Sequence, residues 1–365
     1  MTSSCPASTS STSSTVSNAY AAAGVDVAAG DRAVDLMRAH LARTRRPEVI
    51  AEDSGFAGLF RLDTSAYRDP VLAASTDGVG TKVMLAQQLD RHDTIGRDLV
   101  GMVVDDLVVS GAEPLFLTDY IACGTVVPER VAAIVSGIAA GCEQAGCTLI
   151  AGETAEHPGV LAPHEYDLAG SGTGVVEADA ILGPRRVQAG DALVALGSSG
   201  PHANGYSLIR RIIADAGLDL ADHIPELDQP LGAALLEPTR IYAADCLELT
   251  RSLPVRAFTH VTGGGLAANL QRSLPSTVDA VVDRATWQPR PVFEFLARQG
   301  AVPHADMEAT FNMGVGMVAV VAADTVADAV ALLEDRGVPA WQLGSTTAGA
   351  GQVRMMGTHP GVTQN

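Results

Sequence analysis

The chain has 365 residues, and its 24 Lys and Arg against 42 Asp and Glu give a formal net charge of −18 at pH 7. A composition that is 47% hydrophobic and 18% charged belongs to a globular protein with room for about two domains, which excludes disorder throughout. Nucleic acid and anionic membranes are poor candidate partners, because both need many basic contacts on one face and the arginines here occur at most in pairs.

The termini and the cysteines predict a soluble cytoplasmic protein. Residues 1–17 are mostly Ser and Thr, carry no basic residue and precede no apolar core, so they indicate a disordered tail and not a signal peptide. No apolar run approaches the roughly 20 residues needed to span a bilayer. Five scattered cysteines without a CxxC pair favour reduced thiols over a disulfide framework or a zinc cluster.

Short apolar runs alternate with segments of helical period, which is typical of α/β or α+β architecture. In the first half we expect strands at 71–75, 114–122, 147–151 and 167–176, and helices at 97–110 and 128–145. Residues 177–190 resemble an interdomain connection. After it we expect strands at 192–196, 255–260, 278–282, 316–321 and near 341, and helices at 206–216, 239–253 and 325–336.

The pattern therefore predicts two domains of similar size with a cleft between them. We expect an N-terminal domain over 18–178 and a C-terminal domain over 179–357, flanked by a tail at 1–17 and another at 358–365. Glycine-rich loops follow several of the predicted strands in both halves, which suits a ligand site at the cleft.

The loop from Asp77 to Lys82, read DGVGTK, has the composition of a nucleotide-phosphate site. Small residues let backbone N–H groups approach an anion, and the carboxylate can hold a hard cation such as Mg²⁺. It is not a Walker A loop, and a plain glycine turn is an equally good interpretation of the loop alone. Lys82 is the one lysine in the chain, and its compact ammonium suits a crowded phosphate pocket better than arginine does.

Two further positions place carboxylates in apolar surroundings. Asp105 and Asp106 lie inside the apolar helix and point about 100° apart, so only one of them need face a site, while the other can be satisfied by a cap or a salt bridge. Glu153 is expected just after a buried strand, where ligand groups gather in open sheets. A helix N-cap at Thr154 is the alternative for this segment.

In the second half, polar residues lie in three glycine-rich loops, at 197–205, 260–265 and 311–316. Such loops present backbone donors and neutral side chains, which suit a sugar phosphate with amide-like substituents. His202 and His260 lie in these loops and not on apolar helix faces, which favours a role in the site.

Taken together, these loops occur in the order found in the phosphoribosylformylglycinamidine cyclo-ligase family, which the chain resembles over roughly residues 18–357. The motifs that carry the resemblance are those at 44–49, 76–82, 92–96, 111–116, 152–156, 198–207, 238–242, 260–265 and 310–316. The resemblance implies a two-domain α+β fold and a homodimer whose N-terminal domains form a β-barrel together. It also implies the fifth step of purine biosynthesis, in which formylglycinamidine ribonucleotide and ATP give aminoimidazole ribonucleotide, ADP and phosphate with Mg²⁺.

By the same resemblance, each motif receives a role. The formyl oxygen is phosphorylated, the amidine nitrogen attacks that carbon, and phosphate leaves as the ring closes. The residues implied for Mg²⁺ are Asp77, Asp106 and Glu153; for the ATP phosphates, Asp77, Gly78, Gly80, Thr81 and Lys82; and for the substrate, His202, Asn204, Thr262, Gly263 and Gly264. Lys82 and His260 are the catalytic candidates, His260 for proton transfer because imidazole titrates near neutral pH.

Two departures from the family pattern leave alternatives open. The family usually has Asn where Asp105 stands, and its glycine-rich loop is replaced here by residues 50–58, in which Glu52 and Asp53 would repel ATP phosphates. A different phosphotransferase of the wider superfamily, such as thiamine-monophosphate kinase, and a catalytically silent nucleotide-binding paralogue are the competing hypotheses.

Overall fold

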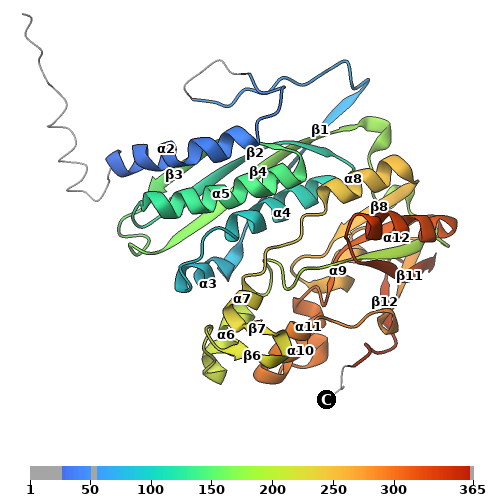
Figure 1. Cartoon of the computed structure of the whole chain (residues 1–365). Helices are drawn as coiled ribbons and strands as arrows, with labels where there is room; N and C mark the ends of the chain where they lie inside the picture. Colours follow the sequence, from blue (N-terminus) through green and yellow to red (C-terminus); the bar gives the residue numbers. More distant parts are fainter. Residues whose placement is uncertain (1–26, 51–55, 362–365) are drawn as a thin grey trace, which may run out of the picture.

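The computed structural model describes residues 27–50 and 56–361. Two sheets dominate it, each with its own helices (Figure 1). The first sheet has the order β1-β4-β2-β3, in which only the β2–β3 pair is parallel. Its elements are α2 (Val27–Arg43), β1 (Pro70–Gly78), α3 (Val83–Gln88), α4 (Ile95–Val108), β2 (Glu113–Cys123), α5 (Pro128–Ala145), β3 (Thr148–Glu156) and β4 (Tyr166–Glu177).

The second sheet has the order β12-β9-β11-β5-β10-β8, and a two-stranded ribbon β6-β7 lies apart from it. The strands are β5 (Ala192–Gly197), β6 (His223–Ile224), β7 (Gln229–Pro230), β8 (Val255–His260), β9 (Val278–Asp283), β10 (Val315–Val321), β11 (Ala340–Ala348) and β12 (Val353–Met356). The helices are α6 (Tyr206–Ala216), α7 (Leu231–Leu235), α8 (Ala243–Ser252), α9 (Gly265–Gln271), α10 (Pro291–Gly300), α11 (His304–Thr310) and α12 (Val326–Asp335).

Burial explains why the central strands of the second sheet read as unbroken apolar runs. Every residue of β5 and β10 is buried, and alternate side chains enter two different hydrophobic clusters, Val194 in one and Leu193 in the other. A strand covered on both faces has no solvent side to carry polar residues.

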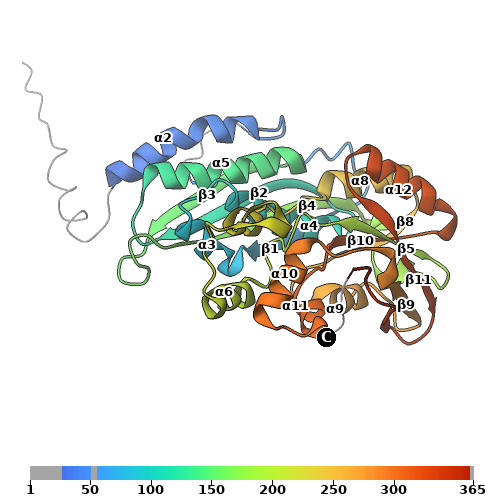
Figure 2. The same ribbon diagram turned by 60° about the horizontal axis from the view of Figure 1, so that its bottom comes forward.

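The first sheet is covered on one face only. Helix α4 lies against this face so closely that a Cβ at Gly170 or Gly172 would contact Leu99 or Val103. On the opposite face the side chains of Leu72 and Tyr120 are 61% and 41% exposed. Figure 2 shows α2 stacked on α5 above the strands of this sheet.

The predicted strands and helices are found in the predicted order, with instructive differences at their ends. Strands β1 and β3 run on to Gly78 and Glu156, because each continues to pair with its neighbour. The helix predicted to start at Thr239 starts at Ala243, since the N–H groups of Thr239 and Tyr242 bond instead to carboxylates of α4. Helices α2, α3, α7, α9, α10 and α11 and strands β6, β7 and β12 were not predicted.

Over the described residues, no helix is long and apolar enough to cross a membrane. Cys123, Cys142, Cys147 and Cys246 are buried free thiols, as predicted for the core. The predicted tail at 1–17 and most of the 50–58 loop, including Glu52 and Asp53, lie outside the described residues.

Candidate active site

The three glycine-rich loops of the second domain meet at one end of its sheet. Strand β10 pairs antiparallel with both β5 and β8, so that Val315 lies opposite Gly197 and Met317 opposite His260. The start of β10 and the ends of β5 and β8 therefore share one edge. This register brings together the loops predicted to bind the substrate.

Helix α4 joins the first domain to this edge. Asp98, Met102 and Asp105 are spaced i, i+4 and i+7, which puts them on one helix face. That face contacts the second domain: Asp98 accepts from the Thr239 hydroxyl at 2.6 Å, the Asn204 amide lies 3.8 Å from the Met102 sulfur, and Asp105 accepts from the Tyr242 N–H at 2.9 Å. One helix therefore fixes how the loops of both domains face each other.

Asp77, Asp106 and His260 form the charged centre of this junction. His260 Nδ1 lies 2.9 Å from Asp106 Oδ1, and Asp77 is close enough for both groups to affect its pKa. The Asp106 side chain is 47% exposed, while His260 is buried and its Nε2 has no partner. Two carboxylates with access to solvent offer the hard oxygen ligands that Mg²⁺ takes, together with waters and substrate phosphates.

Burial and charge act on these groups in opposite directions. Burial raises the pKa of Asp77, and the neighbouring Asp106 raises it further. For His260, burial lowers the pKa, but the hydrogen bond to Asp106 and the charges of Asp105, Asp106 and Asp77 outweigh it, so the net pKa is raised. Desolvation together with the nearby His260 and Lys82 charges lowers the pKa of His202 well below its usual value. His202 is therefore neutral at pH 7.

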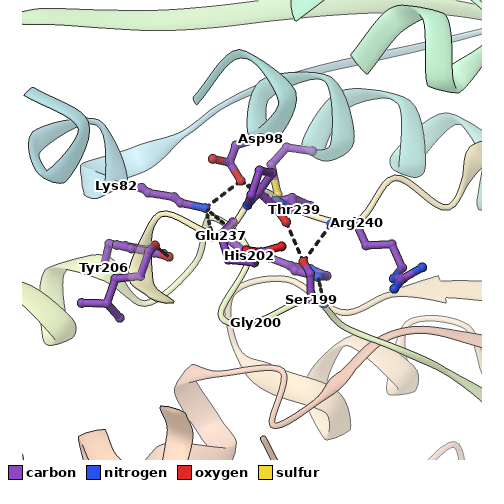
Figure 3. A network of polar contacts seen from close by, with 12 residues as sticks. Lys82, Asp98, Ser199, Gly200, His202, Tyr206, Glu237, Thr239 and Arg240 are labelled. Atoms are coloured by element: carbon purple, nitrogen blue, oxygen red, sulfur yellow. Dashed lines mark hydrogen bonds and ion pairs between the residues drawn. The ribbon is translucent and has the colours of Figure 1, made fainter. Parts of the chain in front are cut away.

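The Lys82 ammonium is occupied by protein acceptors, which does not favour the expected contact with ATP phosphates (Figure 3). The Lys82 side chain is 0% exposed, and its ammonium donates to Asp98 Oδ1 at 2.8 Å, to the His202 carbonyl at 2.9 Å and to the Glu237 carbonyl at 2.8 Å. An ammonium has three donors, and all are used. The ammonium also lies over the aromatic ring of Tyr206, 5.4 Å from the ring centroid. Lys82 thus joins the two domains and has no donor left for a phosphate.

The backbone part of the same loop remains open. Gly80 is exposed with φ +54° and Thr81 is partly exposed, its hydroxyl 3.2 Å from that of Ser207. Gly78 follows Asp77 at the end of β1, and its N–H donates to the Asp77 carboxylate at 2.7 Å. The loop lies beside the His202 segment, because a Cβ at Gly80 would be 3.6 Å from the Ala203 carbonyl.

The predicted substrate residues lie together around the junction. His202 is buried with φ +61°, and its Nε2 accepts from the Ser199 N–H at 3.3 Å while Nδ1 has no partner. Asn204 lies next to Gly263: the Asn204 Oδ1 atom is 3.4 Å from the position that a Cβ on Gly263 would occupy. On either side of Gly263, the Thr262 hydroxyl donates to Asn269 Oδ1 at 3.4 Å and Gly264 has φ +92°.

Two buried asparagines that the sequence analysis did not select hold these loops. Asn269 donates to the carbonyls of Thr262, Gly263 and Gly265. Asn312 accepts from the Ser198 hydroxyl and the Gly314 N–H, and donates to the Gly200 carbonyl. Asn312 lies in a loop that was recognised, but nothing in its spacing distinguishes a side chain that binds loops from one that binds ligand.

Asp98 was also missed, although a signal for it existed. Like Asp105 and Asp106 it is a carboxylate within an apolar helix, and it is 0% exposed. An unpaired charge there would be very costly, so a buried cation partner was inferable from the sequence. That its partner is Lys82 follows only from the tertiary structure.

Glu153 is not brought to Asp77 and Asp106. It lies within β3, opposite Tyr120, and not after the strand as expected; the N-cap alternative at Thr154 is likewise wrong. Strands β1 and β3 are the two edges of the sheet, three strand spacings or roughly 14 Å apart. Because Tyr120 and Glu153 share the exposed face, Glu153 points away from the α4 side. One chain therefore does not assemble the predicted three-carboxylate metal site.

Asp105 is the member of the Asp105-Asp106 pair that does not face the site. Burial raises its pKa to about 7, against the opposing effects of His260 and of hydrogen bonds from the Tyr242 and Ala243 N–H groups at the start of α8. It therefore acts as a cap for α8, which is the structural alternative considered for one of the two residues.

Asp105→Asn is expected to stabilise the protein increasingly as pH rises. A carboxyl whose pKa is about 7 when folded and near 3.8 when unfolded costs stability between those two values, up to roughly 4 kcal/mol above pH 7. The neutral amide can accept the same N–H bonds without this cost. Urea unfolding at pH 5 and pH 8 measures the effect, and an equal difference between the two proteins at both pH values would contradict it.

Comparison with known proteins places this arrangement in a class of two-domain proteins. Residues 57–176 match the family model "AIR synthase related protein, N-terminal domain", and residues 188–356 match its C-terminal counterpart. Among solved structures, the thiamine-monophosphate kinase from Stenotrophomonas maltophilia superposes with a TM-score of 0.65 at 23% identity, over 90% of this chain and 96% of that one. The hydrogenase maturation protein HypE in complex with ATP gives 0.63 at 20% identity, over 90% and 91%. These likenesses establish the shared fold.

The sequence relatives are more specific. The phosphoribosylformylglycinamidine cyclo-ligase of Geobacillus kaustophilus is 50% identical over 337 residues, 92% of this chain and 97% of that protein, and the one of Myxococcus xanthus is 50% identical over 334 residues. The chain belongs to the phosphoribosylformylglycinamidine cyclo-ligase family. The recognition made from the sequence motifs, and the prediction of a ligase, are confirmed.

Proposed function

We propose that this chain closes the imidazole ring of aminoimidazole ribonucleotide from formylglycinamidine ribonucleotide, with ATP converted to ADP and phosphate, as a cytoplasmic enzyme of purine biosynthesis. The observation that carries the proposal is the Asp77–Asp106–His260 centre, placed where the loops of both domains meet. The family to which the chain belongs supplies the reaction, and the buried free thiols suit a reducing compartment.

In the proposed reaction, the formyl oxygen of the substrate attacks the γ-phosphorus of ATP and ADP leaves. The amidine nitrogen then attacks the same carbon, the phosphorylated oxygen departs as phosphate, and a proton is lost from nitrogen. Phosphoryl transfer of this kind depends mainly on positioning and charge neutralisation. Asp77 and Asp106 are the residues that would hold Mg²⁺, which supplies countercharge to the phosphates when bound.

The chain's own groups then divide the remaining tasks. Gly80 and Thr81 would bind phosphate oxygens through backbone N–H groups, without help from Lys82, while the Gly78 N–H already donates to the Asp77 carboxylate. The neutral His202, Asn204 and the 262–264 loop would bind the substrate. His260 Nε2 is the candidate proton carrier, because Nδ1 is bonded to Asp106 and Nε2 is buried and unpartnered.

A direct assay tests the proposal. Purified protein with formylglycinamidine ribonucleotide and Mg-ATP should produce aminoimidazole ribonucleotide and one ADP per turnover, and its gene should restore growth of a purine auxotroph lacking the cyclo-ligase. ADP release with thiamine monophosphate, and none with formylglycinamidine ribonucleotide, would favour the kinase alternative. A folded protein active with neither substrate would indicate the silent paralogue.

We also propose that two chains pair through the exposed faces of their first sheets to form a closed β-barrel. Leu72 and Tyr120 lie on this face and are 61% and 41% exposed, so it presents an apolar and an aromatic side chain to solvent. Glu153 lies on that face, out of reach of its own chain's carboxylates. Pairing is what would allow Glu153 to serve a metal site, namely that of the partner chain.

Leu72→Asp is expected to produce monomers with strongly reduced activity, because a charge would be buried on the proposed contact face. Analytical ultracentrifugation measures the association state. Val160→Asp is the matched control, since Val160 is 80% exposed outside the strands. A Leu72→Asp protein that stays dimeric would rule out this pairing.

A further inference from the structure

A second group of metal-ligating side chains lies in the C-terminal domain, outside the site described above. His304 and Glu308 are one turn apart on α11, and His359 comes from the segment that follows β12. One ligand atom of each residue can be chosen so that all three lie within 4.8 Å of one another. We propose that His304, Glu308 and His359 form a binding site for one divalent transition-metal ion of the Zn²⁺ class, which ties the C-terminal segment to α11.

The distances within the group suit such an ion. Glu308 Oε1 lies 3.3 Å from His304 Nε2 and 3.2 Å from His359 Nε2. Zinc bonds nitrogen and oxygen at about 2.0–2.1 Å, so two ligands at a tetrahedral angle are separated by about 3.3 Å. Two imidazoles and one carboxylate are also a ligand set that Zn²⁺ takes when its fourth position is left to water or an exogenous ligand. Two ligands at i and i+4 share one helix face, which preorganises half of the site.

A cavity adjoins the His304 side of this group. His304 and Met307 line a cavity of about 440 Å³ between α10 and α11, whose wall also includes Glu294, Arg298 and Met313. The His359 side chain is 0% exposed, whereas that of His304 is 23% exposed. An ion held here would therefore be covered on the His359 side and reachable from the His304 side.

Neighbouring side chains hold the ligands in place. Arg284 donates to both oxygens of Glu308, at 2.6 and 2.8 Å. This bidentate pairing holds the Glu308 carboxylate in one orientation. Hydrogen bonds to a ligating carboxylate are common around metals, although the Arg284 charge also reduces the affinity for a cation.

His359 is fixed by aromatic contacts. Its ring lies edge-on to that of Trp287 at a centroid distance of 4.4 Å and to that of His304 at 5.3 Å. Trp287 is one of only two tryptophans in the chain, and the other, Trp341, is 6.4 Å from it. Tryptophan emission therefore reports on this site directly, without any need to measure catalysis.

The test is a titration of the full-length, metal-stripped protein with Co²⁺ and Zn²⁺ in excess Mg²⁺. We expect saturable quenching of tryptophan emission by Co²⁺, Zn²⁺ competition for the same site, and one ion per chain by calorimetry. Zn²⁺ should also raise the melting temperature. His359→Gln and His304→Gln should each weaken binding at least about tenfold, since even the loss of outer-shell partners costs 10–100-fold.

Two further variants separate this site from other imidazoles. His260→Gln should keep the quenching, which would show that the ion is not at the Asp77–Asp106–His260 centre. His223→Gln, at an exposed histidine on β6, should keep it as well. Because His304 is partly exposed, its variant should fold normally by circular dichroism even if His359→Gln does not. Absence of saturable quenching in the wild type, or quenching unchanged in folded His304→Gln, would overturn the proposal.

Discussion

Lys82→Met is expected to lower the free energy of unfolding by about 3–5 kcal/mol, which is the usual result of breaking a buried ion pair by removing one partner. The substitution leaves Asp98 with an uncompensated charge at 0% exposure and removes the donor from the carbonyls of His202 and Glu237. Urea unfolding followed by circular dichroism measures the change.

Two controls assign the cause. In Lys82→Met/Asp98→Asn both charges are absent and the amide oxygen can still accept from Thr239, so much of the lost stability should return. Arg251→Met breaks the exposed pair with Glu248 and should cost less than about 1 kcal/mol. A loss below about 1 kcal/mol in Lys82→Met would mean that the buried pair does not join the domains.

Lys82→Arg separates this joining role from phosphate binding. Three acceptors converge on a compact ammonium, and a planar guanidinium has a different shape and donor geometry. We expect ATP turnover to fall by more than about tenfold together with a loss of stability. Impaired affinity for ATP at unchanged stability would instead restore Lys82 as a phosphate ligand.

The second large effect is expected at His260, where His260→Gln should reduce kcat by about 100-fold or more if Nε2 carries the proton. Steady-state kinetics measures the loss, and His223→Gln, on the exposed β6 strand, serves as the control. A smaller effect than about tenfold would remove His260 from the proton-transfer step.

Asp106→Asn tests the role of His260 through the pKa of the His260 imidazole. The Asp106 hydrogen bond and charge raise the His260 pKa, so the neutral amide should lower it and shift the acidic limb of the kcat profile to lower pH.

In the wild type, the stability due to protonated His260 is fully present below its unfolded pKa, near 6.5, and is lost as pH rises through the folded value. Asp106→Asn should remove that pH-dependent part and raise the Mg²⁺ requirement. A pH profile and metal titration identical to the wild type would contradict both roles.

Much of the secondary structure was predictable because it depends on local patterns. The apolar runs of β5, β8 and β10 and the period of α6 determine these elements almost to the residue. The start of α8 was wrong by four residues, since its preceding N–H groups bond to Asp98 and Asp105, which are more than 130 positions away in the chain. No local sequence pattern predicts a contact between residues so far apart in the chain.

The sequence by itself determined the family, the order of the elements and the loops that surround the site, because composition, periodicity and glycine motifs are properties of the chain. Only the tertiary structure decided what each charge does. It paired the single lysine with Asp98, made Asp105 a cap and Asp106 a partner of His260, and placed Glu153 on the far edge of the sheet. The physical reason is that a buried charge is defined by its partner, and partners are chosen by packing between domains.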